Sequence, residues 1–344
     1  MDLFDDLPEP EKLRPSTPEA PGWGAPEVDV FADLPPPKGE NRGTKRKAQE
    51  GEDEAPDPPR GCVKLRGFCA QKRGEREEMQ DRHVLLEDFH TLIPNLHPSV
   101  SRVSYFAVFD GHGGARASDF AAENLHRHLA QRFPHGPLSR IEKEMGRALV
   151  EAFRRTDEEF LVLASRGRPR WKDGTTALVL LAVEDALFVA NLGDSKAVLC
   201  RWDEESKRHL PLPLSVDHTP TDYRERMRIQ KAGGYVREGR VMGAIEVSRS
   251  LGDAPFKGVG VSSVPDVRLL RPSARDPFLL MACDGLWKVL GSQEALQLVL
   301  PDTKEDAPEE ICWESACGRL ASEAVRKCSG DNVTVLLVAI NKIR

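Results

Sequence analysis

The chain repeats one arrangement four times, in which an apolar stretch typical of a buried strand meets an aspartate that lies close to a glycine. The runs "YFAVF", "LFVANLG" and "FLLMAC" lead into Asp110, Asp194 and Asp284, and Asp331 precedes "NVTVLLVAI". Taken singly, each aspartate suits an ordinary turn, because Asp-Gly is a common turn dipeptide. The fourfold repetition predicts instead that buried strands end at one acidic cleft.

Such a cleft needs cations, because clustered carboxylates repel one another and raise each other's pKa values. Ligands that are all oxygen suit the hard ions Mg²⁺ or Mn²⁺ better than Zn²⁺. In "FAVFDGHGG" (106–114), we expect Asp110 to bridge two ions and the Gly111 carbonyl to approach them closely. Paired metal ions are a known device for displacing phosphate esters, since they share a hydroxide and neutralise charge on the transferred group.

Three further side chains would complete a phosphate site. Arg76, in "GEREEMQD", offers a two-pronged contact to phosphate oxygens, although it equally suits a solvated loop. Asp81 lies five residues later and can hold metal-bound water. His112 either donates a proton to the leaving oxygen or caps its turn.

Several other catalytic classes are excluded by the sequence. No cysteine has an arginine six residues later, and GDxHG and GNHE are absent. Neither GxxxxGK[ST], GxGxxG nor GxSxG occurs, which argues against a nucleotide-driven enzyme or a serine hydrolase. The 7 cysteines show no CxxC spacing and predict reduced thiols.

The hydrophobic pattern predicts an α+β fold. Strands are expected at 62–70, 82–88, 102–110, 175–184, 186–193, 196–202, 277–284 and 332–340, and helices at 115–133, 139–165, 220–232, 291–300 and 309–327. The turns between the strands at 175–202 are too short for crossover helices, so these strands should be antiparallel. Runs of strands with helices between them favour antiparallel sheets covered by helices.

The first 60 residues differ in composition from the rest. They hold 12 of the 26 prolines and carry a net charge of −7. We expect residues 1–58 to form a disordered acidic leader and residues 59–344 to form the folded domain. The leader's repeat, "DLFDDLPEP" and "DVFADLPPP", is either a docking peptide or drift in a biased composition; "KRK" at 45–47 is either a nuclear import signal or a chance match.

The motifs resemble those of the metal-dependent protein phosphatases of type 2C. "REEMQD", "FAVFDGHGG", "DGTTA", "ANLGDSKAVL", "VSRSLGD", "LLMACDGLW" and "DNVTVLLV" follow in the order of that family. The resemblance covers residues 65–340 and implies a sandwich of two antiparallel β-sheets flanked by α-helices. It also implies a binuclear Mg²⁺ or Mn²⁺ site, a weaker third ion, and phosphoserine or phosphothreonine substrates.

By resemblance, each matching residue takes a role. Asp110 resembles the bridging carboxylate and Gly111 the carbonyl ligand. Asp284 and Asp331 resemble the ligands of the first metal, Arg76 the phosphate-binding group and His112 the general acid. Asp194 resembles a ligand of the third metal, and residues 218–234 the start of a flap near the active site. Gln80 and Lys288 depart from the family pattern, where carboxylates are common, and both reduce negative charge near the metals.

We therefore expect a protein serine/threonine phosphatase acting in kinase signalling. The alternative is a scaffold that binds phosphoproteins or a kinase through the leader, with weak catalysis. The start "MDLFDDLPEP" lacks a secretory signal, and Glu184 and Asp185 interrupt the longest apolar stretch. These features predict a cytoplasmic protein that binds no membrane, and "KRK" adds the nucleus if it is an import signal. We also expect a monomer that binds no nucleic acid.

Overall fold

The computed structural model describes residues 63–300 and 311–342. The chain divides into two units, Met1–Pro56 and Asp57–Arg344, and the described residues belong to the second. The leader at 1–58, its repeat and the "KRK" cluster lie outside the described residues, so the division at residue 58 stays a prediction.

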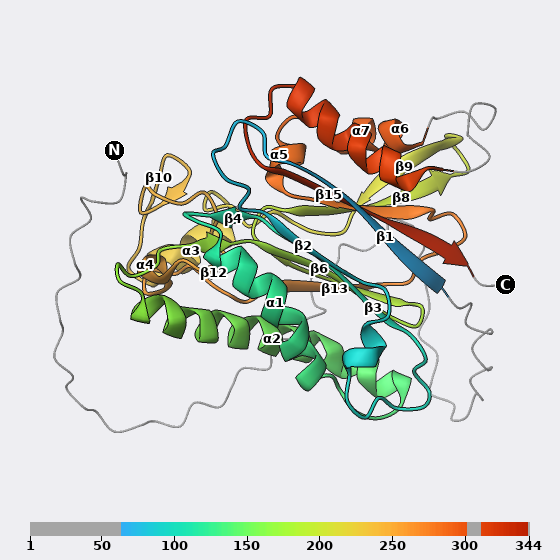
Figure 1. Ribbon diagram of the computed structural model, residues 1–344, viewed down its shortest axis with the longest axis horizontal. Coiled ribbons are helices and arrows are strands. Elements are labelled where there is room, and N and C mark those ends of the chain that lie inside the picture. The colour runs from blue at the N-terminus through green and yellow to red at the C-terminus, as the bar shows by residue number, and fades with distance from the viewer. Residues whose placement is uncertain (1–62, 301–310, 343–344) are drawn as a thin grey trace, which may run out of the picture. The chain divides into compact units, whose positions relative to one another are not determined.

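Two five-stranded antiparallel sheets form the centre of the second unit (Figure 1). The first sheet contains, in order, β1 (Val63–Lys72), β15 (Val333–Lys342), β14 (Phe278–Ala282), β8 (Lys196–Asp203) and β9 (Arg208–Pro213). The second contains β13 (Asp266–Leu270), β7 (Ala186–Leu192), β6 (Ala177–Val183), β3 (Val103–Phe109) and β2 (Arg82–Leu86).

Helices cover the outer face of each sheet. The second sheet is covered by α1 (Arg116–Gln131) and α2 (Leu138–Arg166), and the first by α6 (Ser292–Val299) and α7 (Trp313–Arg326), as Figure 1 shows. Four shorter elements are η1 (Phe89–Leu92), β4 (Gly111–His112), β5 (Gly174–Thr175) and α5 (Asp284–Trp287). Among the described helices, none is long and apolar enough to cross a membrane.

Side chains alternate between two environments along the buried strands, as a period of two requires. In β3, Phe106 and Val108 lie in the core between the sheets, whereas Tyr105 and Ala107 face the core beneath α1 and α2. The continuous apolar runs in the sequence therefore mark strands covered on both faces, and the predicted α+β sandwich is confirmed.

The predicted antiparallel arrangement of the strands at 175–202 is confirmed, although they do not all belong to one sheet. Strand β6 pairs with β7, whereas β8 pairs with β14 and β9 in the other sheet. Gly193, at φ +107°, lies in the turn between β7 and β8. The chain therefore crosses from one sheet to the other at Asp194, which places this carboxylate between the sheets.

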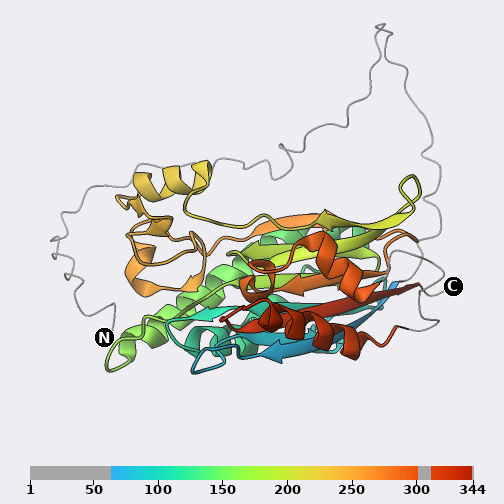
Figure 2. The same cartoon turned by 90° about the horizontal axis from the view of Figure 1, so that it is seen from above.

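Residues 218–264, which we call the flap segment, lie at one end of the sheets (Figure 2). The segment contains α3 (Tyr223–Lys231), β10 (Val236–Arg237), β11 (Arg240–Val241), β12 (Leu251–Gly252) and α4 (Ala254–Lys257). It has its own apolar cluster around Ile229, Val241 and Phe256. The predicted helix at 220–232 is confirmed in shorter form, because the Asp222 side chain caps its start and Gly233, at φ +87°, follows its end.

Candidate active site

Five aspartates come to the same end of the sandwich because each lies at a strand end. Asp81 precedes β2, Asp110 follows β3, Asp194 joins β7 to β8, Asp284 follows β14 and Asp331 precedes β15. They derive from both sheets, so the sandwich itself assembles the acidic cleft predicted from the strand-end pattern.

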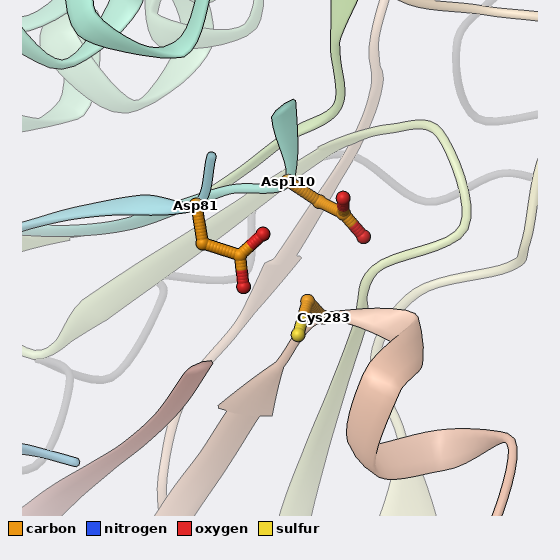
Figure 3. A group of neighbouring side chains, drawn as sticks. All are labelled: Asp81, Asp110 and Cys283. Carbon is orange, nitrogen blue, oxygen red and sulfur yellow. The ribbon is translucent and has the colours of Figure 1, made fainter. Parts of the chain in front are cut away.

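Asp110 is shared by two groups of possible metal ligands. One ligand atom each from Asp110, Asp194 and Asp284 lies within 4.8 Å of the others, and the same holds for Asp81, Asp110 and Cys283 (Figure 3). A carboxylate common to both groups fits the bridging position predicted for Asp110. Asp331 belongs to neither group, but its negative charge adds to the repulsion on Asp81 and Asp110.

The carboxylates destabilise one another's charged forms. Burial, followed by the charges of Asp81 and Asp284, raises the pKa of Asp110 well above its usual range. Burial and Asp284 raise the pKa of Asp194 to about 7. Burial also raises the pKa of Asp81 to about 6, although Thr334 donates a hydrogen bond of 2.7 Å to its Oδ2.

These residues fit divalent ions. The Oδ1 atom of Asp81 is buried without a hydrogen-bond partner, as expected of an oxygen that serves a cation or its water. The sulfur of Cys283 is already engaged, because it donates to the Asn332 carbonyl at 3.4 Å and accepts from the backbone N–H of Thr334 at 3.1 Å. The donors are therefore carboxylate oxygens, which Mg²⁺ and Mn²⁺ prefer.

Gly111 follows Asp110 at a point where no side chain fits. A Cβ on this residue would lie 2.4 Å from the Gln80 carbonyl oxygen and 2.7 Å from the Ser118 hydroxyl. The backbone of Asp110 is also fixed, since its N–H donates to Thr176 Oγ1 at 3.1 Å and its carbonyl accepts from the Thr175 hydroxyl at 3.0 Å. Position 111 thus keeps a bare backbone next to the shared carboxylate.

Arg76 lies beside the cleft, in contact with Asp331. Its Nη2 is 3.0 Å from Asp331 Oδ2, and 60% of its side chain is exposed. A guanidinium has five N–H donors, so this one contact leaves others for a phosphate. Asn332, which the sequence analysis missed, fixes the loop that carries Arg76, because its amide donates to the carbonyls of Arg73 and Glu78.

The same amide side chain accepts a hydrogen bond of 2.7 Å from the backbone N–H of Gln80. The main-chain atoms of Gln80 thus help to join this loop to the start of β15, and its carbonyl also accepts from Ser118 at 2.5 Å. The role of the Gln80 side chain at a third ion or bound water stays a prediction.

His112 pairs with a carboxylate that the sequence analysis also missed. Its Nε2 is 2.7 Å from Oδ2 of Asp253, and that oxygen also accepts from the Ser250 hydroxyl at 2.6 Å. Burial favours the neutral imidazole, but the charge and hydrogen bond of Asp253, together with the charges of Asp194 and Asp284, outweigh burial and raise the pKa of His112. The imidazole ring of His112 is therefore held by the Asp253 carboxylate, a contact that capping the turn would not require.

A small sheet brings His112 and Asp253 together. Strand β5 pairs with β4, which contains His112, and with β12, which ends just before Asp253. Gly174 lies between them, where a Cβ would be 2.3 Å from both His112 Nε2 and Asp253 Oδ2. The glycine of "DGTTA" is therefore required by the contact between the two side chains, a signal visible in the sequence only as an unexplained Asp-Gly.

Lys288 points toward the cleft rather than away from it. Its Nζ is 2.5 Å from Asp284 Oδ2 and 3.4 Å from Glu246 Oε2 of the flap segment. Burial opposes its charge, but Asp284, Glu246 and Asp194 raise its pKa, so the side chain is an ammonium at neutral pH.

Comparison with known proteins gives one consistent result. A family model described as "Protein phosphatase 2C" matches residues 69–333. The chain is 48% identical to an integrin-linked kinase-associated serine/threonine phosphatase 2C of Bos taurus, over 99% of this chain and 100% of the relative.

Solved structures show the same fold. A sex-determining protein of C. elegans gives a TM-score of 0.65 at 26% identity, covering 80% of this chain and 64% of that one. A serine-threonine phosphatase 2C of Toxoplasma gondii gives a TM-score of 0.65 at 20% identity, covering 80% of this chain and 95% of that one.

Proposed function

The chain belongs to the protein phosphatase 2C family and is a protein serine/threonine phosphatase, and we propose that its cleft holds two Mg²⁺ or Mn²⁺ ions around Asp110. The observation that supports this is the position of Asp110 in both groups of converging ligand atoms. Asp284 and Asp331 would hold the first ion, and Gly111 would offer its carbonyl. When bound, such ions supply an activated water as nucleophile and neutralise charge on the transferred phosphoryl group.

The surrounding side chains position the substrate and move a proton. Arg76 would bind the phosphate oxygens with the donors that Asp331 does not occupy. Because Asp253 holds Nε2 of His112, we assign the delivery of a proton to the leaving serine or threonine oxygen to Nδ1. The Asp81 oxygen that has no partner would accept a hydrogen bond from metal-bound water.

The scaffold alternative is not favoured, since the matches span the catalytic region and relate the chain to phosphatases. We further propose that a kinase is a partner in signalling, namely integrin-linked kinase, because the relative named for that association aligns over 99% of this chain. A monomer found in cytoplasm and nucleus is proposed from the sequence, with "KRK" at 45–47 as the import signal.

Replacement of the shared carboxylate tests the two-ion proposal. Asp110→Asn should lower turnover of a phosphothreonine peptide by at least about a hundredfold, because both ions lose a charged ligand. Asp203→Asn, at the last residue of β8, is the matched control and should keep wild-type turnover, since its side chain accepts hydrogen bonds from Ser206 of the following turn. The assay compares Mn²⁺, Mg²⁺ and a chelator; a fully active Asp110→Asn enzyme, or wild-type activity that survives chelation, would contradict the proposal.

A further inference from the structure

Lys288 lies one helical turn beyond Asp284, so both side chains emerge on the same face of α5. The backbone N–H of Lys288 donates to the Asp284 carbonyl at 2.8 Å, and its Nζ lies 2.5 Å from Asp284 Oδ2. About half of the Lys288 side chain is exposed, whereas only 14% of the Asp284 side chain is. The ammonium therefore shields this carboxylate on its open side.

The same ammonium faces the corner of the cleft that Asp194 and Asp284 form. One ligand atom of each of these aspartates lies within 4.8 Å of the other. Lys288 and Asp194 attract each other electrostatically, and His112 also favours the charged form of this carboxylate. A lysine thus supplies positive charge where the family resemblance places a weaker third ion.

We propose that the ammonium of Lys288 takes the place of a third divalent ion at Asp194 and Asp284, so that the enzyme binds two ions and carries a fixed cation of its own. This inference rests on the proposed two-ion site. A divalent ion bound to Oδ2 of Asp284 would face an ammonium already 2.5 Å from that oxygen, and charges at such distances interact strongly even when screened.

A fixed cation also joins the cleft to the flap segment. Lys288 Nζ contacts Glu246 Oε2 at 3.4 Å, and Glu246 also pairs with Arg240. An ammonium has three N–H donors, so it can hold Asp284 and Glu246 at once. Lys288 is therefore a positioning residue for the flap segment as well as a counter-ion for Asp284.

Counting bound metal tests this inference without measuring activity. Each protein is dialysed to equilibrium against Mn²⁺, and the metal per chain is determined by mass spectrometry, with half-saturation from calorimetry. We expect two Mn²⁺ for the wild type and three for Lys288→Asp, because that variant adds a carboxylate and removes the repelling charge. Lys288→Met removes the charge without adding a ligand, so it should bind two ions, with half-saturation about tenfold lower.

The matched control is Lys207→Asp, which makes the same charge change in the β8–β9 turn at the opposite end of the sheets (Figure 1). It should bind metal like the wild type, and thermal unfolding will show that each variant is folded. Three ions in the wild type, or two in a folded Lys288→Asp, would overturn the inference. Fewer than two in the wild type would instead refute the underlying two-ion site.

Discussion

Asp253 is a single residue that determines what His112 can do, because its carboxylate holds Nε2 of the imidazole ring. Only 1% of this residue is exposed, and its Oδ2 receives hydrogen bonds from both His112 and Ser250. Its φ of +51° lies in the left-handed region, which aspartate tolerates better than most residues. Such a constrained backbone is consistent with a side chain held for function.

Asp253→Asn should therefore impair proton delivery more than phosphate binding. We expect turnover of a phosphothreonine peptide to fall about ten- to hundredfold, because an alkoxide leaving group needs the proton. Turnover of an aryl phosphate, whose leaving group is stable as an anion, should fall less than about threefold. Steady-state kinetics on both substrates makes the comparison.

The matched control is Ser250→Ala, which removes one hydrogen bond to Asp253 and leaves the contact with His112. It should affect both substrates only slightly. An equal loss on both substrates for Asp253→Asn, in a protein with unchanged thermal unfolding, would show that Asp253 does not act through His112.

The strand-end pattern allowed residues far apart along the chain to be placed together, whereas contacts that no local sequence pattern marks were missed. Asp110, Asp194 and Asp284 could be placed together because each terminates an apolar run. Asp253 lies 141 residues from His112, and nothing local to "VSRSLGD" indicates that contact. Asn332 was missed for the same reason, since it joins the loop at 73–80 to the start of β15.

Among the elements, the flap segment depends on one buried carboxylate in α3. Glu225 is 3% exposed and accepts hydrogen bonds from Arg228 at 2.7 Å, Arg249 at 2.8 Å and Ser248 at 2.5 Å. Burial alone would raise its pKa, but the hydrogen bonds from Arg249, Arg228 and Ser248 outweigh burial and lower the pKa to about 2. These contacts tie α3 to the stretch that leads into β12.

A lowered pKa in the folded state means that this carboxylate stabilises the fold when ionised. Its contribution is present above pH 4.5, the usual value, and is lost as the pH falls toward 2. Glu225→Gln should therefore lower the free energy of unfolding by about 2 kcal/mol at pH 7. The difference from the wild type should shrink steadily between pH 4.5 and pH 2.

Urea unfolding followed by circular dichroism at several pH values measures this difference. Glu238→Gln, an exposed carboxylate of the same flap segment, provides the control and should match the wild type throughout. A gap between Glu225→Gln and the wild type that stays constant from pH 7 to pH 2.5 would show that packing, not charge, accounts for the loss.

Periodicity identified the long elements, whereas sheet membership and the shortest strands escaped it. The pattern at 196–202 indicates a strand covered on both faces, but the same pattern fits either sheet, so the crossing at Gly193 was not foreseen. Strands β4, β5 and β12 contain two residues each, too few to show alternation. Those three strands nevertheless bring His112 and Asp253 together.

For the whole molecule, the active site depends on the sandwich and not on any one sheet. Asp81 and Asp110 flank strands of the second sheet, while Asp284 and Asp331 flank strands of the first. All of them lie within the family match at 69–333. Catalysis should therefore require only the second unit of the chain.

Removal of residues 1–58 tests this separation of roles. The truncated protein should turn over a phosphothreonine peptide within about twofold of the full chain, because the acidic, proline-rich leader is predicted to add no packing to the domain. Capture of integrin-linked kinase and nuclear accumulation should both be lost. A full-length chain with Lys45, Arg46 and Lys47 changed to alanine is the matched control, and it should lose nuclear accumulation alone. If the truncated protein loses turnover on the short peptide, the leader belongs to the catalytic domain; if the alanine variant still accumulates in the nucleus, "KRK" is not the import signal.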